Sequence, residues 1–404
     1  MTDSKTFLMR RNALEGFVFY YNKLADGDYK YKYFPKTKNQ PNYDNAPKIA
    51  VPITSIFINK IANLLHAGMT IEFSNAAQQA VWDAYAAENN WNEFSRNVLV
   101  KTLICGNVLT TLTQDKVNNI PILNTWDGQF VFEDETSIGY EYVLNTRTNM
   151  SYPYISHKDR FNNDEKLITV PINEIMYGDE IHMLGFTPAV LFKAIDRDED
   201  DVYGVPYYMR FRDLNIEYNH IISQISKAIK ILQNVIVTNT DPTPDEPELR
   251  IDPDTVLRTG RDGKVEQLIR NLNTEPEHTY AKELLDLIHN AAQIPSFLSG
   301  LGGSPVTNLE SGVALEILSS PVKELMSRLR LNYKDSLNEL VEKIMFLLYA
   351  FNGVTPPTLD FQITLNQNVV PTDKTRELDN LIKLVNAGIL TPEAVRNVAE
   401  DLIK

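Results

Sequence analysis

The chain has 404 residues, more than one hydrophobic core usually serves, so we expect two or more lobes. Its formal net charge is −14, whereas proteins that grip nucleic acid over a broad surface usually show a basic footprint. Two interpretations of the negative charge remain: an acidic wall that lets nucleic acid pass without adhering, and an ordinary solubilising surface. No apolar run approaches the roughly 20 residues that cross a bilayer, and the first residues lack the apolar core of a signal peptide. The single Cys105, in an apolar segment, agrees with a cytosolic origin and predicts a buried, inert thiol.

The first lobe is predicted to mix helices and strands. Residues 1–45 predict a helix followed by an extended arm rich in Tyr and Lys. The apolar spacing from Val51 to Ala67 predicts a helix that ends at Gly68. The pattern then predicts, in order, the strand MTIEF, helices over 75–89 and 93–104, a turn at Gly106-Asn107 into the strand VLTTLTQ, and antiparallel strands in the runs QFVFED, IGYEYVL, KLITV and PAVLFKAI.

Two helices that flank a small β-containing segment come next. Gly204-Val205-Pro206 opens a helix over 207–232. The intervening segment, 233–275, contains the run VIVTN, a proline-rich acidic turn and a hairpin signal at Asp262-Gly263. A second helix is expected after Pro276, as far as Ala292. The apolar stripe of the first helix consists of Leu214, Ile221, Ile222, Ile225, Ile229 and Leu232.

A glycine-rich loop, SGLGGSP, precedes a helical pattern of roughly forty residues, several times the usual helix length of about 11–12 residues. Pro321 lies inside this pattern and is predicted to kink the helix. The loop does not fit a phosphate cradle, because it follows a helix instead of a strand and no lysine comes after it. We therefore expect a flexible loop with an apolar side at Val306 and Leu309.

The remaining residues predict one strand and a helical tail. The strand spans 360–366 and is expected to return to the sheet of the first lobe. The tail at 372–404 predicts two short helices, of which the first ends at Gly388 and the second begins at Thr391.

Few residues point to catalysis or metal binding. The six histidines have no metal-ligand spacing, and no Gly-x-Ser-x-Gly, His-Glu-x-x-His or Cys-x-x-Cys motif occurs. An acidic loop could chelate a hard cation, although its spacing matches neither an EF-hand nor a two-metal nuclease. A solvated loop is favoured over a metal-dependent nuclease, and we predict no catalytic residue, no metal, no cofactor and no enzymatic activity. The loop consists of Asp196, Asp198, Glu199, Asp200 and Asp201, with Arg197 between the first two.

The order of these parts resembles the portal proteins of tailed bacteriophages, particularly the siphophage-type family. Each matching stretch is short and indicates little alone. The order of the stretches along nearly the whole chain is what points to this family. The stretches are KIAVPITSIFINKIANLLHAG, CGNVLTTL, TWDGQFVFED, YGVPYYMRFRDLNIEYNHIISQIS, IPSFLSGLGGSPVTNLESGVALEI and GILTPEAV.

The resemblance implies an α+β, mainly helical portal fold with wing, stem, clip and crown. The wing would span 1–206, including the N-terminal arm, and would be completed by the long kinked helix and the returning strand at 311–371. The stem helices would span 207–232 and 277–293, on either side of a clip at 233–276. A tunnel loop would span 294–310, and a short helical crown would span 372–404.

The resemblance also implies particular roles for individual residues. Lys227 and Lys230 would form belts of positive charge in the channel, since a ring repeats each side chain once per subunit. The clip would present a docking surface at Asp241, Asp245, Glu246 and Glu248. The tunnel loop would bring to the DNA channel Ser299, Gly300, Leu301, Gly302, Gly303, Ser304, Val306, Thr307 and Asn308.

The implied function is a ring, usually of twelve copies, at a unique capsid vertex. Double-stranded DNA would pass through it without sequence readout, packaged by the terminase large subunit and later ejected. Further implied partners are a head-completion or adaptor protein, the major capsid protein and the scaffold, with a role in nucleating capsid assembly. The protein would reside in the virion after assembly in the host bacterial cytoplasm, with no membrane. The alternative to a portal protein is another phage head structural or adaptor protein.

Overall fold

The structure is a computed structural model, and it describes residues 2–35, 47–133, 138–153, 165–177, 180–181, 184–196, 203–232, 236–238, 265–267, 274–301, 312–366, 382–383 and 385. The chain divides into two compact units, as its length predicts. Unit 1 comprises Met1–Leu14, Phe57–Tyr207 and Gln293–Lys404, and unit 2 comprises Glu15–Ile56 and Tyr208–Ala292. Each unit is therefore built from stretches that are distant in the sequence.

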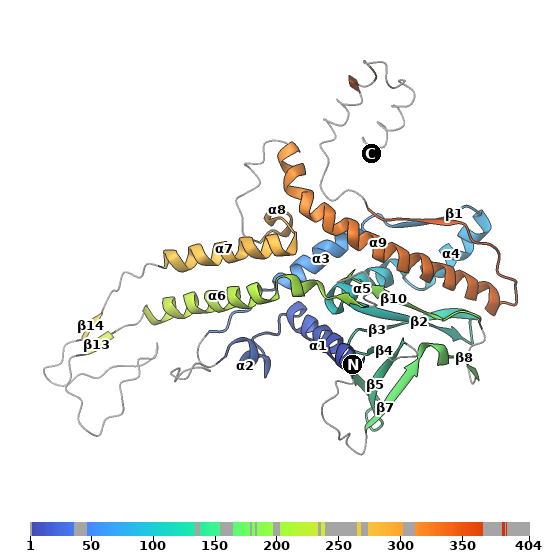
Figure 1. Cartoon of the computed structure of the whole chain (residues 1–404), viewed down its shortest axis with the longest axis horizontal. Helices are drawn as coiled ribbons and strands as arrows, with labels where there is room; N and C mark the ends of the chain where they lie inside the picture. Colours follow the sequence, from blue (N-terminus) through green and yellow to red (C-terminus); the bar gives the residue numbers. More distant parts are fainter. Residues whose placement is uncertain are drawn as a thin grey trace. The chain divides into compact units, whose positions relative to one another are not determined.

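The predicted helices at the start of unit 1 are present (Figure 1). Helix α3 (Ile53–His66) is followed by Gly68, whose φ of 70° lies in the left-handed region that ends helices. Helix α4 (Ala76–Glu88) begins at Asn75, whose side-chain oxygen accepts from the Ala77 N–H at 2.8 Å. Helix α5 (Trp91–Cys105) buries most of its second half, including Cys105, and that burial raises the pKa of the Cys105 thiol.

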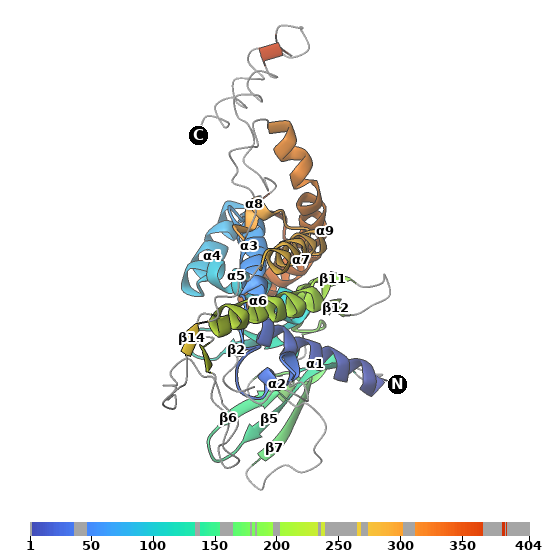
Figure 2. The ribbon, with the colours of Figure 1, turned by 90° about the vertical axis from the view of Figure 1, so that its left-hand side faces the viewer.

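Two antiparallel sheets form the β part of unit 1. In the first, β2 (Asn107–Asp115) lies between β3 (Ile120–Asp127) and β10 (Ala189–Lys193). In the second, β5 (Ile138–Asn145) pairs with β4 (Val131–Glu133), β6 (Met150–Pro153) and β7 (Glu165–Pro171). Figure 2 shows β5, β6 and β7 side by side. The pairs β8 (Met176–Tyr177) with β9 (Glu180–Ile181), and β11 (Ile195–Asp196) with β12 (Gly204–Val205), are short. The sequence pattern did not single out β3, because in that strand only Pro121 is buried and no alternation shows.

The sheets share a core with the first turns of α1 (Thr2–Tyr20). Met9 packs with Leu109, Val131, Ile175 and Ala189. Arg10 is buried beside this cluster, where its Nε donates to the Val131 carbonyl at 2.9 Å and its Nη1 to the Glu141 carboxylate at 3.0 Å. The predicted N-terminal helix is thus an integral part of the fold.

The motif Gly106-Asn107 forms a tight corner with Gly204. Gly106 has a φ of 84°, and a Cβ there would lie 2.5 Å from the Gly204 carbonyl oxygen, so only glycine fits. The Asn107 side chain accepts from the Gly204 N–H at 2.8 Å and donates to the Gly204 carbonyl at 3.2 Å. This corner fixes the backbone shortly before the chain leaves unit 1 at Tyr207.

The predicted long helix is α9 (Gly312–Phe351), a 40-residue helix that contains Pro321. It covers the outer edge of the first sheet, because Lys343 Nζ donates to the Ala189 carbonyl at 2.8 Å and Ser336 Oγ to the Leu191 carbonyl at 3.2 Å. These donors satisfy acceptors that an open edge strand would leave to another chain. The kink at Pro321 stays a prediction.

The strand expected at 360–366 is β15 (Phe361–Thr364), and it does return to the first lobe. It pairs with β1 (Thr70–Phe73), with Ile71 opposite Ile363, in a separate two-stranded sheet. The predicted return to the first lobe is confirmed, and the sheet that the strand joins there is this two-stranded one.

Unit 2 contains the end of α1 from Glu15 onward, α2 (Tyr29–Tyr33), α6 (Arg212–Leu232) and α7 (Glu275–Ala292). The helix predicted over 207–232 begins instead as the 3₁₀ turn η2 (Tyr207–Arg210), and the α-helix starts at Arg212. Tyr207 and Tyr208 are fully buried. Part of the arm predicted as extended is the short helix α2.

Several predicted segments lie outside the described residues. These are the arm from 36 to 46, most of the clip, the tunnel loop after Leu301, and the crown apart from 382–383 and 385. Among the residues that the structure describes, no helix has the length and apolarity of a membrane span.

Candidate functional site: the α6/α7 hairpin and the start of the glycine loop

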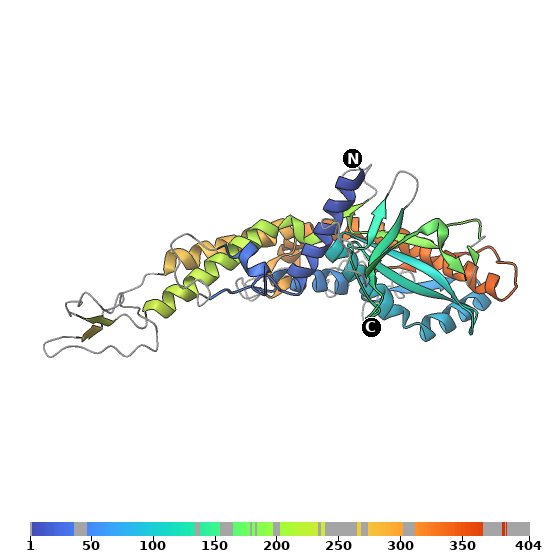
Figure 3. The same ribbon diagram turned by 90° about the horizontal axis from the view of Figure 1, so that it is seen from below.

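Helices α6 and α7 run side by side as a hairpin within unit 2 (Figure 3). Between them in the sequence, β13 (Ile236–Thr238) pairs antiparallel with β14 (Val265–Gln267). The predicted order of helix, small β segment and helix is thus present. The hairpin turn predicted at Asp262-Gly263 lies outside the described residues, and the described partner of β14 is β13.

The buried face of α6 carries a row of polar side chains spaced four residues apart. Asn215, Asn219 and Ser223 are at most 7% exposed. Asn219 Oδ1 accepts from the Val51 N–H at 2.9 Å, and Ser223 Oγ accepts from the Ile49 N–H at 2.8 Å. An extended segment of unit 2 therefore lies along α6, and side chains of the helix satisfy its backbone.

This polar row was not expected from the sequence, and it accompanies the predicted apolar stripe of α6. Of the six stripe residues, only Ile225 is buried among the described side chains, while Ile229 is 42% exposed. The residues of the polar row keep the same helical period as an apolar stripe would. Sequence reasoning missed them because their hydrogen-bond partners, 49–51, are about 170 residues away in the chain.

A buried carboxylate ties the start of α6 to the N-terminal helices of unit 2. Glu15, on α1, accepts from Arg212 Nε at 3.0 Å and Nη2 at 2.8 Å, and from Lys32 Nζ at 2.8 Å. The hydroxyls of Tyr33 and Tyr208 also donate to it, the latter at 3.1 Å. Burial opposes the charged form, but the hydrogen bonds from Arg212, Lys32 and Tyr33 outweigh it and lower the Glu15 pKa to about 2.

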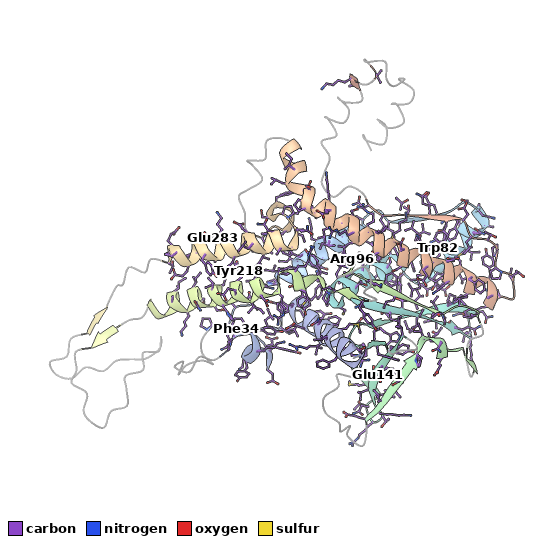
Figure 4. The ribbon with its side chains drawn as sticks, viewed as in Figure 1. Phe34, Trp82, Arg96, Glu141, Tyr218 and Glu283 are labelled. Atoms are coloured by element: carbon purple, nitrogen blue, oxygen red, sulfur yellow. The ribbon has the colours of Figure 1, made fainter. Side chains whose placement is uncertain are left out.

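The outer surface of α7 is mainly acidic, with two exposed apolar side chains. Glu283 is exposed on α7 and is labelled in Figure 4. Before it in the sequence, Tyr280 is 43% exposed, and after it, Leu287 is 52% exposed. Four carboxylates on the exposed positions of α7 oppose one lysine. These are Glu275, Glu277, Glu283 and Asp286 against Lys282.

Of the two predicted belt lysines, Lys227 is half-buried on α6, and it makes no ion pair within the described part of the chain. The side chain of Lys230 lies outside the described residues. The direction in which either lysine faces in an assembly stays a prediction.

The start of the predicted tunnel loop belongs to unit 1. The one-turn helix α8 (Ser296–Ser299) ends at Gly300, whose φ of 72° is left-handed and whose N–H donates to the Ser296 carbonyl at 3.1 Å. Leu301 N–H donates to Ser299 Oγ at 3.1 Å. The remaining loop residues lie outside the described ones, as do the clip residues and the acidic loop after Asp196. They are Gly302, Gly303, Ser304, Val306, Thr307 and Asn308 of the loop, and Asp241, Asp245, Glu246 and Glu248 of the clip.

One pair in unit 1 has the spacing of a nucleophile and its base. His66 Nε2 lies 2.8 Å from Ser95 Oγ, and burial lowers the pKa of His66. Ser95 is fully buried inside α5, however, and its hydroxyl donates to the Trp91 carbonyl at 2.8 Å, so no substrate reaches it. The pair joins α3 to α5 structurally. Within the described residues, no group of His, Cys, Asp or Glu side chains could hold a metal ion.

A mixed α/β unit, a helix hairpin with a β pair inserted in it, a glycine turn and a 40-residue helix are, in this order, the parts expected of a phage portal protein. The family model for phage portal proteins of the SPP1 Gp6-like type matches residues 10–402, and the chain belongs to this family. No curated protein matches the chain.

Solved structures of gene transfer agent (GTA) particles resemble the fold. The chain is 14% identical to a chain of the virion of the native GTA particle, with a TM-score of 0.49, covering 87% of this chain and 90% of that one. For the neck of the empty particle, computed with C6 symmetry, the identity is 14%, the TM-score 0.49 and the coverage 90% and 94%. For the neck of the native particle, computed with C12 symmetry, these values are 15%, 0.48, 86% and 89%.

Proposed function

We propose that this chain assembles into a ring that forms the DNA channel at a unique vertex of a phage capsid. The family match across residues 10–402 carries this proposal. Twelve copies are expected from the family resemblance. The terminase motor drives double-stranded DNA through the ring during packaging, and the DNA leaves by the same route on ejection.

The chemistry of the chain suits a channel that DNA crosses without adhering to it. The net charge of −14 limits phosphate binding to places where cations gather. Lys227 and Lys230 are the candidates for such belts on α6, since a ring repeats each of them in every subunit. Contacts to phosphates carry no sequence information, so the channel accepts any DNA sequence.

The other parts have assigned roles in the same proposal. The clip at 233–276 docks the terminase and later a head-completion or adaptor protein, through Asp241, Asp245, Glu246 and Glu248. The loop after α8 projects into the channel, and its glycines let the loops of one ring adapt independently to the helical DNA. The wing contacts the major capsid protein and scaffold, and the ring nucleates capsid assembly in the host cytoplasm.

Electron microscopy and native mass spectrometry of the purified protein test the ring directly. We expect closed rings with a central pore and one dominant subunit number. A protein that stays monomeric at high concentration would refute the proposal.

Deleting 299–308 tests the loop separately. The rings should assemble as in the wild type, while the amount of DNA packaged or retained should fall. Intact rings with unchanged packaging would refute the assignment of this loop to the channel.

A further inference from the structure

Unit 1 contains a cavity of about 480 Å³ that is lined by residues of α4, of the start of α5 and of β1. Helix α4 contacts both of the other elements, so all three hold the cavity in shape. Its volume lies within the range of about 300–1,000 Å³ that ligand sites have. The proposed DNA channel involves none of its lining residues.

Two tryptophans line this cavity. Trp82 on α4, labelled in Figure 4, and Trp91 at the start of α5 have ring centroids 4.9 Å apart in an edge-to-face arrangement. They are 3% and 4% exposed, so the surrounding side chains fix both rings in place. The face of an aromatic ring attracts cations, and tryptophan does so most strongly.

The charged side chains that line the cavity are both acidic. Asp83 and Glu93 are exposed, and neither has an ion-pair partner among the described residues. Asp83 accepts a hydrogen bond from the neutral Gln79 amide at 2.8 Å, which leaves its charge uncompensated. The N-terminus of α5 contributes a positive charge of about half a unit, and two full negative charges exceed it. The cavity therefore attracts a cation.

The cavity wall also contains a donor without an acceptor. The indole N–H of Trp91 is buried and has no hydrogen-bond partner within the part of the chain that the structure describes. Nearly all buried polar groups in folded proteins are paired, so an acceptor from a bound molecule is expected beside this ring. A bare metal ion offers no acceptor, whereas a peptide with a cationic side chain offers both a cation and carbonyl oxygens.

We propose that this cavity binds an arginine side chain from a basic segment of a partner protein. The guanidinium lies over an indole ring and pairs with Asp83 and Glu93, and a carbonyl of the same segment accepts from the Trp91 N–H. Arginine fits better than lysine, because its planar guanidinium stacks on aromatic rings and presents donors to two carboxylates at once. The site lies within unit 1 and does not depend on the proposed ring.

Saturation-transfer difference NMR with the full-length protein tests the site, since this method detects weak ligands of large proteins. The probe is Nα-acetyl-arginine amide, and Nα-acetyl-citrulline amide is its neutral control of nearly the same shape. The arginine probe should bind with a Kd in the millimolar range, and the citrulline compound should bind about tenfold more weakly. Equal binding of the two would overturn the proposal. Stronger binding of Nα-acetyl-glutamate amide would overturn it too, because the N-terminus of α5 would then dominate.

Asp83→Asn combined with Glu93→Gln removes both charges, keeps the side-chain size and keeps an acceptor for Gln79. This double variant should bind the arginine probe about tenfold more weakly than the wild type. Glu88→Gln is the matched control, since Glu88 is an exposed carboxylate at the end of α4 that does not line the cavity. It should bind like the wild type, and circular dichroism confirms that the variants are folded. Equal weakening in the control would indicate general attraction to an acidic protein and would refute the site.

Native mass spectrometry of the double variant separates a partner protein from a second copy of this chain. Its ring fraction should equal that of the wild type. A lower ring fraction in the folded variant would assign the cavity to the contact between subunits and overturn the proposal. A wild-type chain that binds the arginine probe but forms no rings would refute the proposed function and leave this site standing.

Discussion

Replacing Glu15 by Gln tests how the start of α6 is fixed. The wild-type carboxylate accepts hydrogen bonds from Arg212, Lys32, Tyr33 and Tyr208 while its side chain is 6% exposed. The glutamine amide is neutral, and its N–H₂ group points donors at donors. Arg212 and Lys32 then lose their counter-charge, and the two tyrosine hydroxyls compete for a single acceptor oxygen.

The pKa shift sets the size of the effect. The Glu15 pKa falls from 4.5 to about 2 in the folded chain, and each pKa unit corresponds to about 1.4 kcal/mol, which gives an upper limit of about 3 kcal/mol. Arg212 and Lys32 are 25% and 44% exposed, so solvent screening lowers the value, and we expect a loss of about 2–3 kcal/mol at pH 7.

The sign of the pH dependence follows from the lowered pKa. Because the folded-state pKa lies below the unfolded one, the stabilisation is fully present above about pH 4.5 and is lost as the pH falls towards 2. The difference between the wild type and Glu15→Gln should therefore shrink across this window. Thermal and urea unfolding, followed by circular dichroism between pH 7 and pH 3, measures it.

Asp26→Asn is the matched control, since it removes a carboxylate that is 59% exposed and paired with Lys23 at 3.0 Å. Exposed pairs contribute about 0–1 kcal/mol, so this variant should unfold almost like the wild type. A Glu15→Gln effect as small as that of the control, or one that stays constant from pH 7 to pH 3, would refute the reasoning.

Three further substitutions test the fold. Gly106→Ala should lower the free energy of unfolding by about 3 kcal/mol or more, because its Cβ would lie 2.5 Å from the Gly204 carbonyl oxygen. Gly68 has a similar φ but open space around it, so Gly68→Ala should lower that free energy by only about 1 kcal/mol. Equal melting temperatures of the two variants would contradict the steric argument. Asn219→Ala removes the acceptor of the Val51 N–H and should lower the free energy of unfolding by about 1–3 kcal/mol. Backbone amides in the segment 47–52 should exchange faster in this variant, and unchanged exchange would contradict the prediction. Tyr333→Phe removes the hydroxyl that donates to the Ser95 carbonyl at 2.8 Å and should lower the free energy of unfolding by about 1 kcal/mol, which denaturant titration resolves from no change.

Much of the secondary structure follows from local sequence. Apolar spacing predicted α3, α4, α5, α7 and the long helix α9, because each buries one face; capping residues marked some of their limits, with Asn75 before α4 and Gly68 after α3. The runs around Val131, Tyr140 and Leu191 alternate and form strands. The order of these elements was also sufficient to indicate the portal family, which the family match over 10–402 confirms.

Tertiary structure decided what local pattern could not. The pairing of β15 with β1, the polar row of α6 and the cluster around Glu15 all join residues that are far apart in the chain. Asn219 has the same helical period whether it faces water or the Val51 N–H, so periodicity cannot distinguish the two. A glutamate on a helix is ordinarily a surface residue, and only the convergence of Arg212, Lys32 and two tyrosines makes Glu15 a buried anion.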